Sequence, residues 1–309
     1  MPIAEVKRNR FDDEYYTMTA ALNFSGKTIV ITGSTRGIGF GYAKYLASLG
    51  ANLLINGVSQ YNVDAATASF QGSPGKILGL ALPVSQGEEI IDFALQAFSR
   101  VDAVINNAGI VRDAQFSNMT VDEWNDVYRV HLEAAFRISK AIWPHYLEKG
   151  GGKILMTSSS AGIFGNFGQA NYSAMKAGII GLTKTLAIEG KKHKIWVNAI
   201  CPAAHTDMND ALMKPELKGH MGAEKVSPVA AYLCHEACSD SGSVIEAGAG
   251  WIAKVSHQYS EVTAEAHQDF GIDTVQSLWP ELNDVKKSRL TYPTKISDIF
   301  KAVAAHIQG

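Results

Sequence analysis

The chain has 309 residues, enough to bury one large core or one core with appendages. Its 28 Lys and Arg residues against 30 Asp and Glu residues give a net charge of -2, so no extended basic face for nucleic acid is expected. Hydrophobic residues make up 46% of the sequence, but none of the apolar runs reaches the roughly 20 residues that cross a bilayer. These values favour a globular α/β protein without a membrane span.

Short apolar segments rich in Val and Ile alternate with segments of helical periodicity, such as 40–50 and 88–101. We expect strands at Lys27–Gly33, Ala51–Gly57, Lys76–Leu82, Val101–Gly109, Lys153–Ser159 and Ile195–Pro202, and a seventh near 241–253. Continuously apolar strands that alternate with helices are typical of a parallel sheet covered on both faces. The pattern predicts a Rossmann-type, doubly wound parallel sheet of about seven strands.

The two ends of the chain lie outside this alternation. We expect a single domain over residues 26–255, with an N-terminal extension (1–25) and a C-terminal extension (256–309) that ends in a helical pattern. The three cysteines are an odd and sparse set, which favours a reducing compartment. Cys234 and Cys238 lack two further ligands at suitable spacing, so no metal site is expected.

A glycine-rich turn follows the first expected strand and opens the first helix. It consists of Gly33, Ser34, Thr35, Arg36, Gly37, Ile38 and Gly39. Glycines allow a tight turn and a close approach to a pyrophosphate, and the helix N-terminus is electropositive. A turn that merely shortens a loop is the alternative. Together with the sequence NNAG (106–109), the T-G-x-x-x-G-x-G spacing resembles the short-chain dehydrogenase/reductase family, which implies a nicotinamide cofactor.

The resemblance places further residues along the cofactor. These are Val84, Asn107, Ala108 and Gly109, with Thr206 near the nicotinamide end. The second strand ends at Gly57, where a carboxylate would hydrogen-bond a ribose 2′-hydroxyl, and Arg36 offers a positive charge to a 2′-phosphate. These two positions favour NADP over NAD, although a solvated surface arginine is the alternative for Arg36.

The stretch QANYSAMK carries a tyrosine and a lysine four residues apart, after a strand that ends at a serine. The resemblance assigns Ser159, Tyr172 and Lys176 to the catalytic set. Reduction of a ketone requires a proton at oxygen, and a free phenol has a pKa of about 10. Because i and i+4 share a helix face, the ammonium of Lys176 is expected to favour the phenolate and to hold the cofactor ribose. The hydroxyl of Ser159 is expected to position the substrate oxygen.

The family usually has an asparagine in the preceding helix, where this chain has His131. That departure, with segments such as WPHYLEK and GIFGNFGQANYSAMKAGIIGL, resembles the (3R)-hydroxyacyl-CoA dehydrogenase unit of peroxisomal multifunctional enzymes of type 2, over roughly residues 24–255. His131 would then serve a proton relay through a ring nitrogen. A core histidine satisfied by a backbone carbonyl is the alternative.

The resemblance implies interconversion of (3R)-3-hydroxyacyl-CoA and 3-oxoacyl-CoA with NAD(P), in fatty-acid metabolism. Asn166 and Phe167 lie where an acyl thioester would pass, though they suit a plain surface turn almost as well. Two alternatives remain: an NADPH-dependent reductase of 3-oxoacyl thioesters on a carrier protein, or of another carbonyl, and a nucleotide sensor without turnover. The family associates through two helices, here Val121 to His145 and Tyr172 to Lys192, which implies a homodimer or homotetramer. The resemblance points to the peroxisome, but the chain ends in HIQG rather than a peroxisomal tripeptide, which leaves a cytoplasmic location open.

Overall fold

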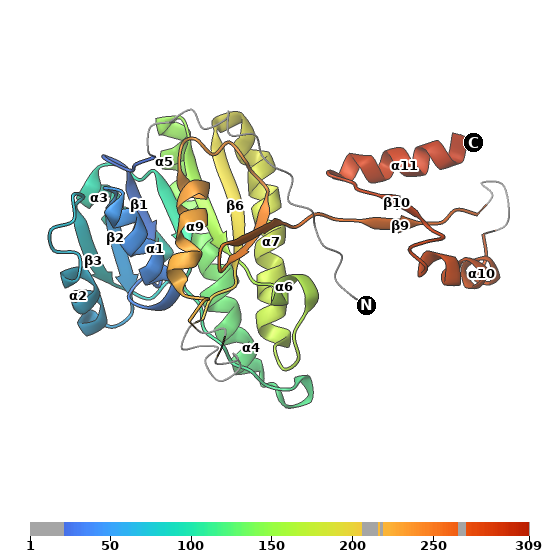
Figure 1. The fold of residues 1–309 in the computed structure, drawn as a ribbon, viewed down its shortest axis with the longest axis horizontal. Coiled ribbons are helices and arrows are strands. Elements are labelled where there is room, and N and C mark those ends of the chain that lie inside the picture. Colours follow the sequence, from blue (N-terminus) through green and yellow to red (C-terminus); the bar gives the residue numbers. More distant parts are fainter. Residues whose placement is uncertain (1–21, 206–215, 217–218, 265–269, 309) are drawn as a thin grey trace.

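The computed structural model describes residues 22–205, 216, 219–264 and 270–308. At its centre lies an eight-stranded sheet in the order β3-β2-β1-β4-β5-β6-β7-β8 (Figure 1). The strands are β1 (Thr28–Ile31), β2 (Asn52–Gly57), β3 (Ile77–Ala81), β4 (Ala103–Asn106), β5 (Gly152–Thr157), β6 (Ile195–Pro202), β7 (Val244–Gly248) and β8 (Trp251–Lys254). β1 to β7 run parallel, which confirms the doubly wound parallel sheet.

The last part of the sheet differs from the expected single strand near 241–253. Ala249 and Gly250 have φ values of 50° and 82°, so the chain turns back there and β8 pairs antiparallel with β7. Two consecutive residues with positive φ are typical of a two-residue hairpin turn. The sheet therefore ends in an antiparallel edge strand.

Helices cover both faces of the sheet. They are α1 (Gly37–Ser48), α2 (Gln60–Ala68), α3 (Gly87–Phe98), α4 (Val121–Tyr128), α5 (Ala134–Lys149), α6 (Ala161–Phe164), α7 (Ala170–Gly190) and α9 (Ser227–Cys234). Helices α1 and α9 share one buried cluster with the sheet, and α3, α5 and α7 share the other. Alternation along β1 produces these two layers, because Ile29 and Ile31 join the first cluster and Val30 joins the second.

The C-terminal extension stands apart from the sheet (Figure 1). It contains β9 (Tyr259–Glu261), α10 (Ile272–Leu282), β10 (Arg289–Thr291) and α11 (Ile296–Gln308). β9 and β10 pair antiparallel in a separate small sheet. Among the residues that the structure describes, no helix has the length and apolarity to cross a bilayer.

Candidate active site

The strand order places a crevice beside β1. The chain proceeds from β1 to β2 and β3 on one side and returns to β4 on the other, so the loops after β1 and β4 diverge at the carboxyl ends of the strands. Ligands of doubly wound sheets bind at such switch points. The glycine turn follows β1, the NNAG sequence ends β4, and Ser159 follows β5, so the sequence motifs meet at this edge.

The glycine turn has the geometry of an anion cradle. Gly33 and Gly37 adopt φ values of 61° and 57°, which favour glycine. A Cβ on Gly39 would lie 2.4 Å from both the Gly33 carbonyl oxygen and Asn107 Nδ2. Helix α1 begins after Arg36 without a side-chain cap, so its first N–H groups point toward the turn. The residues present therefore fit the pyrophosphate of a dinucleotide.

Thr32 and Asn107 lock the loop after β4 to this turn. Thr32 Oγ1 accepts hydrogen bonds from the backbone N–H groups of Asn107 (2.9 Å) and Ala108 (3.1 Å). Asn107 Nδ2 donates to the carbonyl oxygens of Thr32 and Gly33, at 3.0 Å each. The side chain of Asn107 thus braces the loops. This role of Thr32 was not predicted from the sequence, although its place directly before the glycines could have indicated it.

The remaining predicted cofactor residues surround the same edge. Arg36 is exposed, and within the described ranges no ion pair or hydrogen bond involves its side chain. A Cβ on Gly57 would lie 2.7 Å from Thr35 Cγ2, so the end of β2 has little room for an acidic side chain. Val84 is buried in the pocket wall. Thr206 lies outside the described residues.

Ser159, Tyr172 and Lys176 come together at the ends of β5 and α7. The hydroxyls of Ser159 and Tyr172 are hydrogen-bonded to each other, and the Ala161 N–H donates to Ser159 Oγ at 3.2 Å. Lys176 lies one helical turn after Tyr172, and its Nζ is 5.4 Å from the centroid of the tyrosine ring. The three side chains share one site, as a serine–tyrosine–lysine mechanism requires.

Lys176 is buried without a carboxylate partner among the described residues. Its Nζ donates to the Thr157 carbonyl oxygen at 2.6 Å, and 3% of the residue is exposed. Burial lowers its pKa to about 7, because a charged ammonium loses its hydration there. Lys176 therefore changes its protonation state near neutral pH.

The electrostatics of Tyr172 differ from our expectation. Burial raises the pKa of Tyr172, and the hydrogen bond with Ser159 offsets only part of that effect. We expected the ammonium of Lys176 to lower this pKa. In the structure Lys176 Nζ bonds the Thr157 carbonyl rather than the phenol oxygen, and burial weakens its own charge. The protein alone thus keeps Tyr172 as a proton donor.

His131 lies in a π-helical turn, Arg129–Glu133, between α4 and α5. Its Nε2 is 3.0 Å from the backbone N and 2.7 Å from the carbonyl oxygen of Ile110, and its ring packs edge-on against Tyr172 with centroids 5.2 Å apart. Burial, assisted by Lys176, lowers the pKa of His131 to about 3. π-Turns in α-helices often mark functional positions. The imidazole is neutral and fixed beside the tyrosine.

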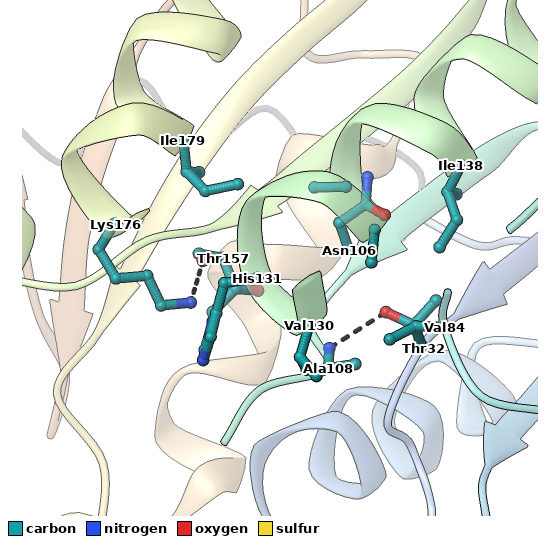
Figure 2. Close-up of a pocket in the computed structure, with 12 residues that line it drawn as sticks. Thr32, Val84, Asn106, Ala108, Val130, His131, Ile138, Thr157, Lys176 and Ile179 are labelled. Carbon is teal, nitrogen blue, oxygen red and sulfur yellow. Dashed lines mark hydrogen bonds between the residues drawn. The ribbon is translucent and has the colours of Figure 1, made fainter. Parts of the chain in front are cut away.

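A small cavity beside these residues collects polar atoms without partners (Figure 2). Its volume is about 10 Å³, and its wall includes Thr32, Asn106, His131, Thr157 and Lys176. Asn106 Oδ1, His131 Nδ1 and Thr157 Oγ1 are buried and have no hydrogen-bond partner. Such a volume holds about one water molecule when several polar groups face it.

The neutral state of His131 predicts a pH-dependent stability. Its folded pKa of about 3 lies below the unfolded value of 6.5, so the unfolded state binds more protons between these values. The stability from this group is complete above pH 6.5 and is lost as the pH falls toward 3. We expect a loss of roughly 2 kcal/mol between pH 7.5 and pH 5 that the variant His131→Asn lacks. Urea unfolding at both pH values measures this difference.

The exposed His193 provides the matched control for this prediction. The variant His193→Asn should keep the wild-type difference between pH 7.5 and pH 5. Equal pH dependence in His131→Asn and the wild-type protein would contradict the buried neutral state of His131.

The loop before α7 holds Asn166 and Phe167 at the surface. Phe167 is 84% exposed, and Asn166 Nδ2 donates to Gln169 Oε1 at 2.8 Å. Gln169 Nε2 in turn donates to the carboxylate of Asp113, at 3.0 and 3.1 Å. This chain of contacts joins the loop before α7 to the loop after β4, so both borders of the crevice are held together. Neither Gln169 nor Asp113 was predicted from the sequence to take part in the site.

Asn171 fixes the start of α7 and hence the place of Tyr172. It is fully buried, and its Nδ2 donates to the carbonyl oxygens of Arg112 (2.9 Å) and Glu123 (3.3 Å). Its Oδ1 accepts the backbone N–H of Tyr172 at 2.7 Å. The buried Asn171 therefore fixes the backbone position from which the Tyr172 side chain extends. Its role depends on distant loops and was missed from the sequence.

The three cysteines lie in the interior. Cys201, Cys234 and Cys238 are buried and free. Over the described parts of the chain, no group of three His, Cys, Asp or Glu side chains is arranged to hold a metal ion.

The chain is similar to known proteins over most of its length. Residues 27–217 match the short chain dehydrogenase family. "Peroxisomal multifunctional enzyme A" of Dictyostelium discoideum is 37% identical over 298 residues, which cover 94% of this chain and 67% of that protein. "3-oxoacyl-[acyl-carrier-protein] reductase FabG" of Escherichia coli is 36% identical over 243 residues, which cover 74% of this chain and 98% of that protein.

A solved structure shows a similar arrangement. The full-length peroxisomal multifunctional enzyme type 2 from Drosophila melanogaster superposes with a TM-score of 0.80 at 30% identity, over 93% of this chain and 50% of that chain. Among the multifunctional relatives, this chain spans between 33% and 67% of the relative's length. The similarity therefore concerns one part of those longer proteins.

Proposed function

Because the chain belongs to the short chain dehydrogenase family, we propose that it interconverts (3R)-3-hydroxyacyl-CoA and 3-oxoacyl-CoA with NAD(P). The observation that carries this proposal is the assembly of Ser159, Tyr172 and Lys176 beside the glycine cradle. The acyl-CoA substrate is inferred from the sequence resemblance to peroxisomal multifunctional enzymes, and a Dictyostelium protein of that name is among the similar proteins. Measured turnover would also distinguish an enzyme from a nucleotide sensor. A sensor without turnover would not need Ser159, Tyr172 and Lys176 together.

The residues of this chain divide the reaction between them. The glycine turn would hold the pyrophosphate of a nicotinamide cofactor, which would supply or accept the hydride when bound. Tyr172 donates a proton to the carbonyl oxygen during reduction, and the raised pKa keeps that proton available. The hydroxyl of Ser159 bonds the same oxygen and orients it beside Tyr172. Oxidation needs the phenolate instead, so the oxidation rate should rise with pH.

We propose that the small cavity holds a water molecule that passes protons toward Lys176 and Tyr172. Asn106 Oδ1, His131 Nδ1 and Thr157 Oγ1 supply the partners that such a water requires. Lys176 Nζ also lines the cavity, and its pKa of about 7 lets it pass a proton near neutrality. His131 would act as a neutral hydrogen-bonding group, because its pKa of about 3 excludes a charged imidazole at working pH.

A substrate comparison tests the proposed function. Acyl-CoA and carrier-protein thioesters of the same 3-oxoacyl chain are compared by kcat/KM, and the (3R)- and (3S)-3-hydroxyacyl-CoA isomers are compared in oxidation. We expect the CoA thioester and the (3R) isomer to be preferred. The similarity to FabG favours the carrier-protein reductase as the second candidate. A preference for the carrier-protein thioester would favour the carrier-protein reductase over the acyl-CoA enzyme. Inactivity with every thioester would refute both candidates.

We propose NADP as the preferred cofactor, based on the exposed charge of Arg36 and the crowded end of β2 at Gly57. The variant Arg36→Ala should weaken NADPH binding about tenfold and leave NADH binding nearly unchanged, because only NADPH carries the 2′-phosphate. Fluorescence titration with both cofactors measures this. The control Lys44→Ala removes another exposed cation from α1 and should affect neither cofactor. Equal losses of affinity for both cofactors would show instead that Arg36 contacts the pyrophosphate, which NADPH and NADH share.

We infer a peroxisomal setting from the names of the multifunctional relatives. The helices α4, α5 and α7 are proposed to form contacts between subunits, in a homodimer or homotetramer. We also take residues 26–255 as the catalytic unit, with extensions at both ends.

A further inference from the structure

The two loops that border the crevice are joined to each other by backbone contacts. One loop follows β4 and contains Asp113 and Ala114, and the other precedes α7 and contains Gly168 and Gln169. The N–H of Ala114 donates to the carbonyl oxygen of Gly168 at 2.9 Å, and Ala114 pairs with Gln169 in an isolated β-bridge. Gly168 has a φ of 74°, a conformation that glycine adopts readily. The loop before α7 therefore runs alongside the loop after β4.

Gln169 strengthens this junction through both ends of its side-chain amide. Its Nε2 donates to both carboxylate oxygens of Asp113, at 3.0 and 3.1 Å, and its Oε1 accepts a hydrogen bond from Asn166 Nδ2 at 2.8 Å. A reversed amide would turn its carbonyl oxygen toward the Asp113 carboxylate, so one orientation satisfies both partners. The amide of Gln169 therefore fixes the place of the Asp113 carboxylate.

Gln169 also connects the junction to the helix that carries the tyrosine. It is the N-cap residue of α7, and its carbonyl oxygen accepts the backbone N–H of Ser173 at 2.8 Å. Tyr172 follows Gln169 by three residues, a spacing that brings two side chains to the same helix face. A displacement of Gln169 would therefore move the first turn of α7 and, with it, Tyr172.

The carboxylate of Asp113 keeps its full charge. No described lysine or arginine forms an ion pair with it, because the neighbouring Arg112 pairs with Asp126 at 3.4 Å and donates to the carbonyl oxygen of Val111. The hydrogen-bond partner of Asp113 is the neutral amide of Gln169. A negative charge is therefore held in place at the border of the crevice.

Ionisable side chains from several elements surround Tyr172. His131 is neutral because its pKa is about 3, and Cys201 on β6 is neutral because burial raises the pKa of its thiol to about 11. The pKa of Lys176 is about 7. Burial is the main cause of the raised pKa of Tyr172, and the negative charge of Asp113 adds to it. Among the residues described, Asp113 is thus the ionised carboxylate that acts on the phenol.

We propose that Asp113 and Gln169 are a positioning pair, in which Gln169 joins the two loops at the crevice border and holds the Asp113 carboxylate on the side of Tyr172. The negative charge opposes ionisation of the phenol. It preserves the proton that reduction needs and moves to higher pH the phenolate that oxidation needs. Neither side chain of the pair transfers a proton. This inference rests on the proposed function, because there Tyr172 carries the proton transfer.

The first test removes the charge and keeps the link. In Asp113→Asn the amide of Gln169 can still donate to a side-chain oxygen, but the negative charge is gone. We measure kcat/KM for oxidation against pH at low ionic strength, because salt screens an exposed carboxylate. We expect the rate to rise at lower pH. On the rising limb, the variant should reach about a threefold larger fraction of its own plateau than the wild-type protein.

Asp122→Asn is the matched control for this test. Asp122 is an exposed carboxylate in the first turn of α4 and does not contribute to the raised pKa of Tyr172. Its replacement removes the same charge from the chain and should leave the pH profile unchanged. A wild-type profile in Asp113→Asn, or an equal shift in Asp113→Asn and Asp122→Asn, would overturn the proposal.

An exchange of the two side chains tests the link itself. Gln169→Glu places two carboxylates against each other, and we expect kcat to fall about tenfold in both directions as the loops separate and Tyr172 is displaced. Adding Asp113→Asn to Gln169→Glu restores a contact between an amide and a carboxylate and should recover most of the lost kcat. The exchanged protein keeps one negative charge at the junction, so its pH profile should lie nearer to the wild-type profile than that of Asp113→Asn. A double variant no faster than Gln169→Glu would refute the positioning role.

Titration of the phenol separates this inference from the proposed function. The tyrosinate absorbance of each protein is recorded against pH, and the curve of the same protein carrying Tyr172→Phe is subtracted, which leaves the signal of Tyr172. We expect this signal to appear at lower pH in Asp113→Asn than in the wild-type protein. If the shift occurs but every thioester is inactive, the proposed function fails and the effect of Asp113 on the phenol stands. If thioesters are turned over but the signal does not shift, the function stands and the pair is refuted.

Discussion

Replacing Tyr172 by Phe is expected to lower kcat/KM by a factor of about 10² to 10⁴ while cofactor binding stays within about twofold of the wild-type value. In the proposed mechanism the phenol moves the proton at the substrate oxygen, and the variant removes only its hydroxyl. In the structure that hydroxyl bonds Ser159, whereas the ring packs against His131 and remains in place. Steady-state assays in both directions and cofactor titration measure the two quantities separately.

The control for this prediction is Tyr61→Phe, which removes an exposed phenol hydroxyl on α2, outside the set of Ser159, Tyr172 and Lys176. It should leave both turnover and binding unchanged. Wild-type turnover in Tyr172→Phe would refute the mechanism. A joint loss of turnover and cofactor binding would instead show that the tyrosine holds the cofactor.

Replacing Lys176 by Met is expected to reduce turnover at least a hundredfold and yet to stabilise the fold. The ammonium is buried, and its pKa falls from 10.5 to about 7 because hydration is lost. Methionine has a similar length and carries no charge, so it avoids the desolvation cost of the buried ammonium, for which we expect roughly 1–4 kcal/mol. We expect the free energy of unfolding at pH 7 to rise by an amount in this range.

The pH dependence identifies the source of that gain. The folded pKa of Lys176 lies below its unfolded value, so the unfolded state binds more protons between pH 7 and 10.5. The wild-type protein should therefore become more stable as the pH rises through this window. Lys176→Met should lose that part of the rise, and the exposed Lys192→Met should keep it. A less stable Lys176→Met protein would show that the lysine is a structural rather than a functional group.

The parallel sheet and the positions of its strands and motifs could be predicted from the sequence because they depend on local patterns. Continuous apolar segments of four to eight residues specify buried strands; β1 to β4 and β6 lie within the segments expected, and β5 begins one residue earlier than expected. The glycine turn at 33–39 requires backbone conformations that few other residues adopt. The spacing of Tyr172 and Lys176 follows from the period of one helix.

Other properties required the tertiary structure, because they arise from groups far apart in the chain. The pKa of Lys176 depends on burial and on the Thr157 carbonyl of β5, and the expected lowering of the Tyr172 pKa was wrong for that reason. The binding of His131 to the backbone of Ile110 joins a helix to the loop after β4. The turn at Ala249 and Gly250 likewise divided one expected strand into two.

The sequence by itself determined the parallel α/β sheet and, through the family resemblance, the residues proposed to carry the chemistry, because strands, turns and helical spacing are local patterns. Only the tertiary structure decided their charge states and partners, because desolvation depends on all segments that surround a group. The same holds for the C-terminal extension: its helical period is visible in the sequence, but the exposure of the apolar side chains of α11 becomes evident only when the chain is folded.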